Sequence, residues 1–435
     1  MNYQQTLDFL YTRLAAFHRV GAAAYKPGLD TTVRLSEAFG NPHRRFRTIH
    51  VGGTNGKGSV SHTLAAILAR AGYRVGLYTS PHLVDFPERI RVNGQPITRD
   101  AVVDFVERFR TLDIDADPSF FELATVMAFD WFARQNVDVA VIEVGLGGRL
   151  DSTNIITPDL CVITNISLDH MAILGDTRPL IAAEKAGIMK VGVPVVIGED
   201  DDEVRPVFNQ VGQDVGAPVI YATQSGQMLD WRLRDDSEGD SRPFVVTRDY
   251  GRFTGDLSGD CQQRNAATIL TAVDALRDKG YRITADAVAE GFANVTADTG
   301  LMGRWMRVGD KPLTVCDTGH NCGAWQYLGP RLAKIAAGRT LHMVIGFVSD
   351  KDLDAIFPYM PRNARWYFVQ PSTPRAARAS AVSAKAAAYG LSGECYDSVK
   401  AGYDAARDSA ADSDTIFVGG STFVVADLLT SQPSD

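Results

Sequence analysis

Short apolar runs alternate with helix-period patterns along most of this 435-residue chain. Such alternation predicts an α/β protein with a mostly parallel sheet. Strands are predicted in the first half at residues 46–51, 74–79, 137–144, 160–165 and 194–197. Helices are predicted at residues 58–71, 120–135 and 179–189, and a longer helix at residues 262–279 ends before Gly280.

A second α/β series begins near residue 302. Its predicted strands lie at residues 313–317, 341–346, 366–369 and 415–418, and its helices at residues 324–337 and 376–388. Between the two series, residues 225–258 are polar and rich in Gly and Asp, which indicates small antiparallel strands, and the acidic run 199–203 indicates a solvated loop. We place the domain boundary within residues 294–300 and expect two domains, residues 1–297 and 298–435.

The composition narrows the class of protein. Apolar residues make up 45% and charged residues 22%, as in an ordinary globular protein. A net charge of −8 argues against nucleic-acid binding. The sequence contains no stretch of 18 apolar residues without charge, so we expect no membrane span. The first residues lack the basic and apolar regions of a signal peptide, and the five cysteines form no C-x-x-C motif. We therefore expect a cytoplasmic protein without disulfides or a zinc site.

The segment GTNGKGS follows a β-branched strand and precedes an apolar-periodic helix; it comprises Gly53, Thr54, Asn55, Gly56, Lys57, Gly58 and Ser59. Strand, glycine-rich loop and helix in this order form a cradle for phosphate. Lys57 would reach the β- and γ-phosphates and Ser59 would bind Mg²⁺. The segment is shorter than the usual P-loop, and a plain turn that packs a helix on a sheet is the alternative. Only the first α/β series carries such a loop, so we expect ATP in a cleft between the domains.

Polar residues at the ends of other predicted strands are candidate metal ligands. Glu143 ends one strand before a glycine-rich turn, where α/β proteins place Mg²⁺ ligands, although an ion pair with an arginine is the alternative. His170 follows the next strand and Ser80 closes another; a structural histidine and a proline turn are the competing interpretations. Lys185 lies in an otherwise apolar helix. If it were buried, its amine could capture CO₂ as a carbamate, but a surface lysine is the more common case.

Two further loops carry polar residues. Residues 150–154, LDSTN, follow the Glu143 strand at the same sheet edge. In the second half, Asp317 and His320 follow a strand, and Asp317 could hold a ribose hydroxyl or a phosphate network. Coincidental polarity of a loop is the alternative for this pair.

Taken together, these segments resemble the folylpolyglutamate synthase/dihydrofolate synthase family of the Mur-ligase superfamily. The matching segments are GTNGKGS at 53–59, TSPHL at 79–83, RIRVNGQPI at 89–97, FFELAT at 120–125, EVGLGGRLDSTN at 143–154, ITNISLDH at 163–170, EKAGI at 184–188, QQRNA at 262–266, GR at 303–304, DTGHN at 317–321 and DKD at 350–352. The first and the EKAGI segments are shared by Mur-type ligases in general. TSPHL and GLGGRLDSTN favour the folate branch.

The resemblance implies an ATP-dependent amide ligase. Its expected fold is an α/β P-loop Mur-ligase-like domain with a mostly parallel sheet, followed by a smaller Rossmann-like C-terminal domain that closes over ATP and binds glutamate. It implies two Mg²⁺ ions and a monovalent cation, and the implied metal ligands are Ser59, Ser80, Glu143, His170 and Lys185, the last as a carbamate. Lys57, Lys185 and His170 are the implied catalytic residues. ATP contacts are implied for the 53–59 loop, Asn265, Arg304, Asp317 and His320, and a pteroate or folate pocket for Phe121, Glu122, Thr125, Leu150, Asp151 and Ser152.

The chain departs from the family pattern in two places. DTGHN stands where D-G-A-H-N is usual, which keeps the polar residues. Cys261 stands where a histidine is frequent before Q-x-x-N, so any role of that histidine is in doubt here.

The implied reaction begins with transfer of the γ-phosphoryl group of ATP to the substrate carboxylate. The amine of L-glutamate then attacks the acyl phosphate and expels phosphate. The expected substrates are dihydropteroate, reduced folates and L-glutamate, and we favour a bifunctional enzyme that acts as a monomer. A UDP-muramoyl amino-acid ligase, and a P-loop kinase or regulatory ATPase, are the competing hypotheses.

Overall fold

The computed structural model describes residues 1–15, 28–114, 116–233 and 242–431. It contains two compact units. The N-terminal unit comprises Met1–Trp231, Phe244–Asp256 and Gln263–Leu301, and the C-terminal unit comprises Arg232–Pro243, Leu257–Gln262 and Met302–Asp435. The division into residues 1–297 and 298–435 stays a prediction.

An eight-stranded sheet forms the centre of the N-terminal unit. Its order is β4-β3-β2-β5-β1-β6-β7-β8. The strands are β1 (Arg47–Gly52), β2 (Val75–Tyr78), β3 (Ile90–Val92), β4 (Gln95–Pro96), β5 (Val139–Glu143), β6 (Leu160–Ile163), β7 (Val195–Ile197) and β8 (Val219–Tyr221). From β2 to β8 the pairs are parallel, whereas β3 and β4 are antiparallel at one edge. The five predicted strands are present, whereas β3, β4 and β8 were not predicted.

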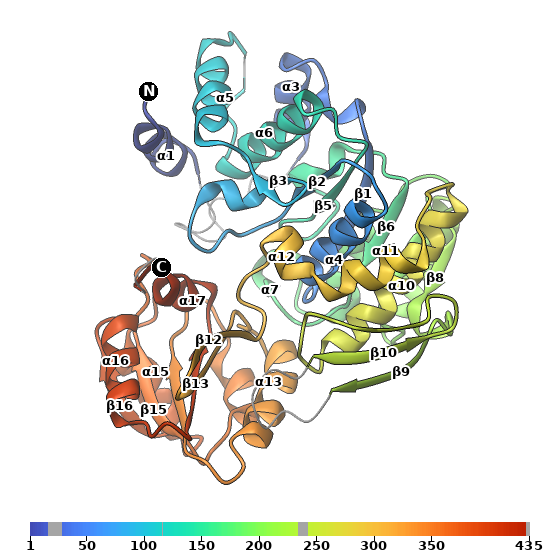
Figure 1. Ribbon diagram of the computed structural model, residues 1–435. Helices are drawn as coiled ribbons and strands as arrows, with labels where there is room; N and C mark the ends of the chain where they lie inside the picture. Colours follow the sequence, from blue (N-terminus) through green and yellow to red (C-terminus); the bar gives the residue numbers. More distant parts are fainter. Residues whose placement is uncertain (16–27, 115, 234–241, 432–435) are drawn as a thin grey trace. The chain divides into compact units, whose positions relative to one another are not determined.

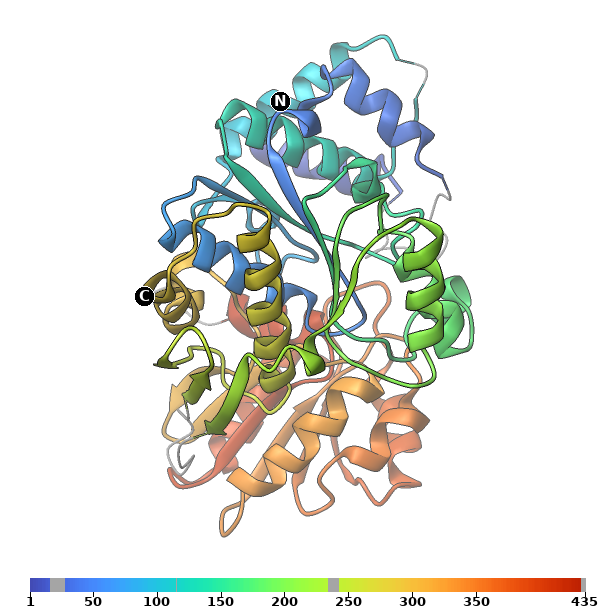
Figure 2. The ribbon, with the colours of Figure 1, turned by 90° about the vertical axis from the view of Figure 1, so that its right-hand side faces the viewer.

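Both faces of this sheet are covered, and the period of two along β5 shows how. Val139 and Val141 belong to one apolar cluster, while Ala140 and Ile142 belong to another. The first cluster is completed by α4 (Lys57–Arg70), α10 (Gln262–Asp278) and α11 (Ala285–Ala293). In Figures 1 and 2 the blue α4 and the yellow α11 lie side by side.

The second cluster is covered by α1 (Tyr3–Thr12), α3 (Asp30–Ala38), α5 (Arg99–Thr111) and α6 (Phe120–Arg134). Further helices of the unit are α7 (Met171–Leu174), α8 (Arg178–Ala186), α9 (Arg205–Asp214) and α12 (Val295–Thr299). The predicted helices correspond to α4, α6, α8 and α10. The helix predicted at 179–189 ends at Ala186, since the backbone N–H groups that follow turn back onto Lys185 and Ala186.

A small sheet follows, in the order β11-β10-β9, with β9 (Met228–Leu233), β10 (Pro243–Thr247) and β11 (Arg252–Thr254). It confirms the small strands predicted for residues 225–258, of which 234–241 lie outside the described residues. The acidic run at 199–203 is a loop, but it is not merely solvated. Asp201 and Glu203 both pair with Arg178, while Glu199 pairs with Arg264.

The C-terminal unit has a six-stranded sheet in the order β12-β13-β17-β14-β15-β16. Its strands are β12 (Met306–Asp310), β13 (Leu313–Asp317), β14 (Leu341–Ile345), β15 (Arg365–Val369), β16 (Gly393–Tyr396) and β17 (Thr415–Gly419). All pairs are parallel except β12 with β13. The helices are α13 (Cys322–Ile335), α14 (Leu353–Ile356), α15 (Ala379–Ala387), α16 (Val399–Ser409) and α17 (Thr422–Ser431).

Two helix starts in this unit differ from the prediction. Helix α13 begins at Cys322 because the side chain of Asn321 accepts the N–H of Ala324 and caps it. Helix α15 begins three residues late because Ala376 instead forms a bridge with Val348. Among the described residues, no helix combines the length and apolarity that crossing a bilayer requires.

Candidate active site

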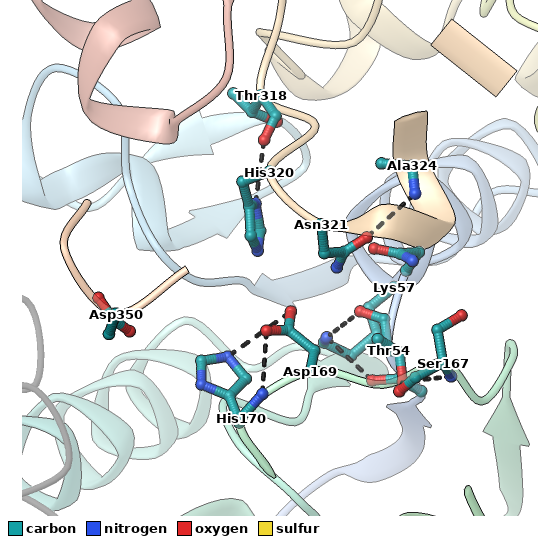
Figure 3. A network of polar contacts seen from close by, with 12 residues as sticks. Thr54, Lys57, Ser167, Asp169, His170, Thr318, His320, Asn321, Ala324 and Asp350 are labelled. Carbon is teal, nitrogen blue, oxygen red and sulfur yellow. Dashed lines mark hydrogen bonds and ion pairs between the residues drawn. The ribbon is translucent and has the colours of Figure 1, made fainter. Parts of the chain in front are cut away.

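The glycine-rich loop lies between β1 and α4, as the sequence predicts for a phosphate cradle. The ammonium group of Lys57, the first residue of α4, donates to the carbonyl oxygens of Gly53 and Thr54, at 3.0 Å each. Figure 3 shows the Lys57 side chain folded back toward Thr54. Ser59 is buried in the first turn of α4. The helix N-terminus and the lysine thus concentrate positive charge at this loop, which suits an anion.

Two glycines of the loop leave no room for a side chain. Gly53 has φ +132°, and a Cβ there would lie 1.9 Å from the hydroxyl oxygen of Thr164. Gly56 has φ +84°, and a Cβ would lie 2.5 Å from Oδ1 of Asn265. Only glycine adopts these backbone angles without strain. The second contact also shows that Asn265, from the first turn of α10, lies directly against the loop.

The loop is fixed by the segment that follows β6. The N–H groups of Thr54 and Asn55 donate to the backbone and side-chain oxygens of Asn165, at 2.9 and 3.0 Å. The hydroxyl of Thr164 donates to the Asn55 carbonyl at 2.5 Å, and the Ser167 N–H donates to the Thr54 hydroxyl at 3.1 Å. These bonds fix the conformation of the loop.

Lys185, on α8, is buried, so the surface-lysine alternative does not apply. It is 4% exposed, and its ammonium group donates to the Gly53 carbonyl at 2.9 Å, beside the one donated by Lys57. Burial, and after it the charge of Lys57, lower the pKa of Lys185 to about 7, while the charges of Asp169 and Asp151 oppose the effect. Near neutral pH much of Lys185 is therefore an uncharged amine.

The other candidate metal ligands lie at or beyond the carboxyl ends of β2, β5 and β6 of the same sheet. Glu143, at the end of β5, is buried, and its Oε2 accepts the backbone N–H of Ser80 at 3.2 Å, so these two residues are adjacent. His170, with φ +52°, follows β6, and its Nε2 lies 4.0 Å from Oδ2 of Asp169 (Figure 3). The Glu143 carboxylate and the Ser80 hydroxyl are oxygen donors of the kind that Mg²⁺ prefers, whereas the His170 imidazole offers a nitrogen.

Among the described residues, no group of three or more His, Cys, Asp or Glu side chains is arranged to hold a metal. The predicted ligands include only two residues of those types, Glu143 and His170. The set depends for the rest on serine hydroxyls and on Lys185, whose amine binds a metal only as a carbamate. Metal binding by these five residues thus stays a prediction.

The predicted substrate residues gather at the loop after β5 and at the start of α6. The ring of Phe121 packs against Gly145, where a Cβ would lie 2.4 Å from the ring. Glu122 accepts the Ser119 N–H at 2.7 Å and so completes the capping box of α6. The hydroxyl of Thr125 lies 3.2 Å from that of Tyr78.

Asp151, between half-buried Leu150 and buried Ser152, accepts the N–H of Leu146 at 2.8 Å. Burial raises the pKa of its carboxyl group, and hydrogen bonds from Thr153, Leu146 and Gly145 oppose the rise. Asp151 thereby holds the glycine-rich turn after β5 in place. For Glu122 and Asp151 the structure shows local structural bonds, and contact with a substrate stays a prediction.

In the C-terminal unit, Asp317 ends β13 and is a hub of the loop that follows. It accepts the N–H groups of Trp305 and Gly319, at 2.8 Å each. Burial raises its pKa, and the charge of Arg304 opposes the rise. His320 Nδ1 lies 3.0 Å from the Thr318 carbonyl (Figure 3). The three predicted residues Arg304, Asp317 and His320 thus share one loop cluster.

Cys261 belongs to the same unit. Burial, and after it the charge of Asp317, raise the pKa of its thiol to about 12. The thiol therefore stays protonated near neutral pH and lies in the electrostatic field of the Asp317 cluster. A neutral thiol cannot supply the positive charge that a protonated histidine would bring to this place.

Several residues of this region were not singled out from the sequence. Thr164 and Asn165 fix the phosphate loop, and His50 and Thr153 form a buried pair below the Asp151 loop. The signal that could have revealed His50 is its place: a polar residue in the middle of a β-branched strand that is buried on both faces.

Two domain families match this chain. The Mur ligase middle domain matches residues 51–273, and the Mur ligase glutamate ligase domain matches residues 303–422. Together with the phosphate loop and the two parallel sheets, these matches define the chain as a Mur-type ligase.

Individual relatives specify the branch. The chain is 34% identical over 380 residues to the dihydrofolate synthase/folylpolyglutamate synthase of Escherichia coli, covering 87% of this chain and 85% of that protein. It is 32% identical to a probable bifunctional folylpolyglutamate synthase/dihydropteroate synthase of Halobacterium salinarum, of which it spans about half the length (52%), with 99% of this chain covered.

Solved structures agree. The folylpolyglutamate synthase of Mycobacterium tuberculosis complexed with ADP is 29% identical, with a TM-score of 0.88 over 100% of this chain and 99% of that one. A bifunctional folylpolyglutamate synthase/dihydrofolate synthase with Mn, AMPPNP and L-glutamate bound gives 29% identity and a TM-score of 0.80, over 99% and 98%. The chain belongs to the dihydrofolate synthase/folylpolyglutamate synthase family. The predicted family, fold class and ligase class are confirmed.

Proposed function

We propose that this chain joins L-glutamate to dihydropteroate and to reduced folates, with ATP converted to ADP and phosphate. The observation that carries the proposal is the meeting of Lys57 and Lys185 at one oxygen, the Gly53 carbonyl of the phosphate loop. This contact supports phosphate binding by Lys57 and a carbamate on Lys185 at the same point of the loop. Relatives were solved with ADP and with Mn and AMPPNP, which supports ATP as the co-substrate and a divalent metal ion as the cofactor.

The chain's residues contribute mainly position and charge. Lys57 exchanges its two carbonyl bonds for phosphate oxygens of ATP, while the N–H groups at the start of α4 point at the same phosphates. The acid substrate, bound at the loop of Asp151 and at Phe121, attacks the γ-phosphorus through a carboxylate oxygen. The products of this step are ADP and an acyl phosphate, and the amine of glutamate then displaces phosphate.

Ser59, Ser80, Glu143 and His170 would hold Mg²⁺, which would supply positive charge to the phosphoryl oxygens. Lys185 completes the ligand set after its free amine adds to CO₂, which forms an N–C bond and releases one proton. Its buried position and its lowered pKa support this role, since only the uncharged amine reacts. We further propose that the protein binds a monovalent cation, acts as a monomer and is located in the cytoplasm.

Asn265 contributes to ATP binding from α10, since its amide already lies against Gly56. Arg304, Asp317 and His320, which belong to the C-terminal unit, contribute further contacts to ATP. The clustering of these three in one loop supports a common task.

The test is a glutamate-dependent ADP-release assay with dihydropteroate and with tetrahydrofolate, the products being weighed by mass spectrometry. We expect ADP with each acid and a mass gain of one glutamyl residue. Oxygen-18 in the substrate carboxylate should appear in the released phosphate. Release of ADP without glutamate addition, or phosphate free of the label, would disprove the acyl-phosphate ligation.

A further inference from the structure

Three buried side chains form a chain of hydrogen bonds from the middle of the sheet to Asp151. His50, on β1, is fully buried, and its Nε2 lies 2.8 Å from the hydroxyl oxygen of Thr153. Thr153, also fully buried, lies in the 3₁₀ turn η4 (Ser152–Ile155) and donates that hydroxyl to Oδ1 of Asp151 at 2.5 Å. None of these bonds belongs to the phosphate loop or to the candidate metal ligands.

The protons available to His50 and Thr153 determine which atom donates in each hydrogen bond. The one hydroxyl proton of Thr153 goes to the carboxylate, so its oxygen accepts from His50, and His50 carries its proton on Nε2. The other ring nitrogen, Nδ1, is buried and has no hydrogen-bond partner. Burial, and then the charge of Lys190, lower the pKa of His50 to about 3, so the ring is neutral. All donors in the chain therefore point toward Asp151.

Asp151 links this chain of hydrogen bonds to the loop after β5. Its Oδ1 also accepts the Thr153 N–H at 3.0 Å, and its Oδ2 accepts the Leu146 N–H at 2.8 Å. The carboxylate thus joins η4 to the glycine-rich turn on which the Phe121 ring packs at Gly145. A buried carboxylate is costly unless donors are aimed at it, and a chain of aligned donors strengthens each bond in it.

We propose that His50 is a positioning residue for the acid substrate: through Thr153 it fixes the carboxylate of Asp151, and with it the loop 145–151 that receives dihydropteroate or a reduced folate. The inference deepens the proposed function and rests on it. His50 touches neither substrate nor ATP. Its loss should weaken binding of the acid without changing binding of the nucleotide.

The experiment uses two pairs of variants of the full chain. His50→Leu and Thr153→Val break the donor chain, whereas His50→Gln and Thr153→Ser keep an N–H and a hydroxyl at the same places. We expect His50→Leu and Thr153→Val to raise the KM for dihydropteroate roughly tenfold, the scale of one lost buried hydrogen bond. The double variant should be no worse than either single variant, because both break one chain. His50→Gln and Thr153→Ser should recover most of the affinity, and Kd for ATP should not change.

A matched control separates positioning from stability. His62 is a second buried histidine of the same unit, and its Nδ1 lies 2.8 Å from the hydroxyl of Thr299. His62→Leu removes an equivalent bond that does not lead to Asp151. We expect it to lower Tm without raising the KM for dihydropteroate. If His62→Leu raises that KM as much as His50→Leu does, the positioning role is refuted.

A readout independent of activity tests the donor chain itself. Long-range ¹H–¹⁵N spectra of the histidine-labelled protein should show one ring, absent in His50→Gln, that keeps its proton on Nε2 and does not titrate between about pH 5 and 8. A proton on Nδ1, or titration in that range, would overturn the proposal even if a variant fails to fold. A wild-type chain that shows this ring but no ligation of either acid would refute the proposed function instead, and with it the assignment of the loop to a substrate.

Discussion

Replacing Lys57 by methionine should change the protonation of Lys185, not only the binding of phosphate. Both ammonium groups donate to the Gly53 carbonyl, at 3.0 and 2.9 Å. The two nitrogens therefore lie no more than about 6 Å apart, where two like charges repel by about 3 kcal/mol at an effective dielectric constant near 20. Methionine keeps the length of the side chain and removes this repulsion.

The repulsion corresponds to about a hundredfold in the proton affinity of Lys185, and solvent around the half-buried Lys57 reduces it to about tenfold. The pKa of Lys185 in the intact chain is about 7, so about three-quarters of it is free amine at about pH 7.5. A tenfold higher proton affinity leaves about a quarter. The carbamate, which forms from the free amine and carries a negative charge, should become scarcer in Lys57→Met on both grounds.

The assay is ¹³C NMR of the protein in labelled bicarbonate, where a carbamate gives a resonance that Lys185→Arg removes. We expect the signal of Lys57→Met to fall at least threefold at about pH 7.5 and to return as the pH is raised. Lys190→Met is the matched control: it also removes a half-buried lysine of this unit, but Lys190 is not among the groups that act on Lys185. An unchanged signal in Lys57→Met, or an equal loss in Lys190→Met, would refute the coupling.

Further expected outcomes concern the loop, the metal and pH. Gly53→Ala places a Cβ 1.9 Å from the Thr164 hydroxyl oxygen, so ATP affinity measured by calorimetry should fall at least tenfold, and unchanged affinity would show that the loop adapts. Chelation of divalent ions should abolish glutamate-dependent ADP release. Added Mg²⁺ or Mn²⁺ should restore this activity in the intact chain, but far less in Glu143→Gln. Full restoration in the variant would exclude Glu143 as a ligand. CO₂-dependent activity should fall as the pH drops through about 7, because protonation of Lys185 removes the amine that reacts, and a pH-independent CO₂ effect would contradict this. The pKa of Asp317 is raised in the native state, so its ionisation destabilises the fold as the pH rises above the unfolded value near 3.8. In urea unfolding, Asp317→Asn should therefore lose less stability between acid and neutral pH than the intact chain does. An identical loss would contradict the raised pKa.

The sequence by itself determined the local elements and their order. The β-branched run of β1, the glycine loop and the apolar period of α4 are neighbours in the chain, so their patterns predict the phosphate cradle without a tertiary contact. The same holds for the other predicted strands of both sheets, whereas β12 and β16 of the C-terminal sheet were not predicted. Strands β3 and β4 at the edge of the sheet were not predicted. Pairing of β3 with β2 and of β4 with β3, rather than a pattern of their own, makes them strands.

Only the tertiary structure decided which side chains meet. Lys185 reaches Gly53 across 132 residues, and Asn265 reaches Gly56 from another helix. A lysine pattern cannot reveal burial, yet burial is what lowers the pKa of Lys185 and makes a carbamate chemically reasonable. The link from His50 to Asp151 likewise depends on a contact between distant segments, since His50 of β1 bonds to Thr153 of η4. Local patterns record what each segment prefers, whereas the environment that sets charge and reactivity arises from segments far apart in the chain.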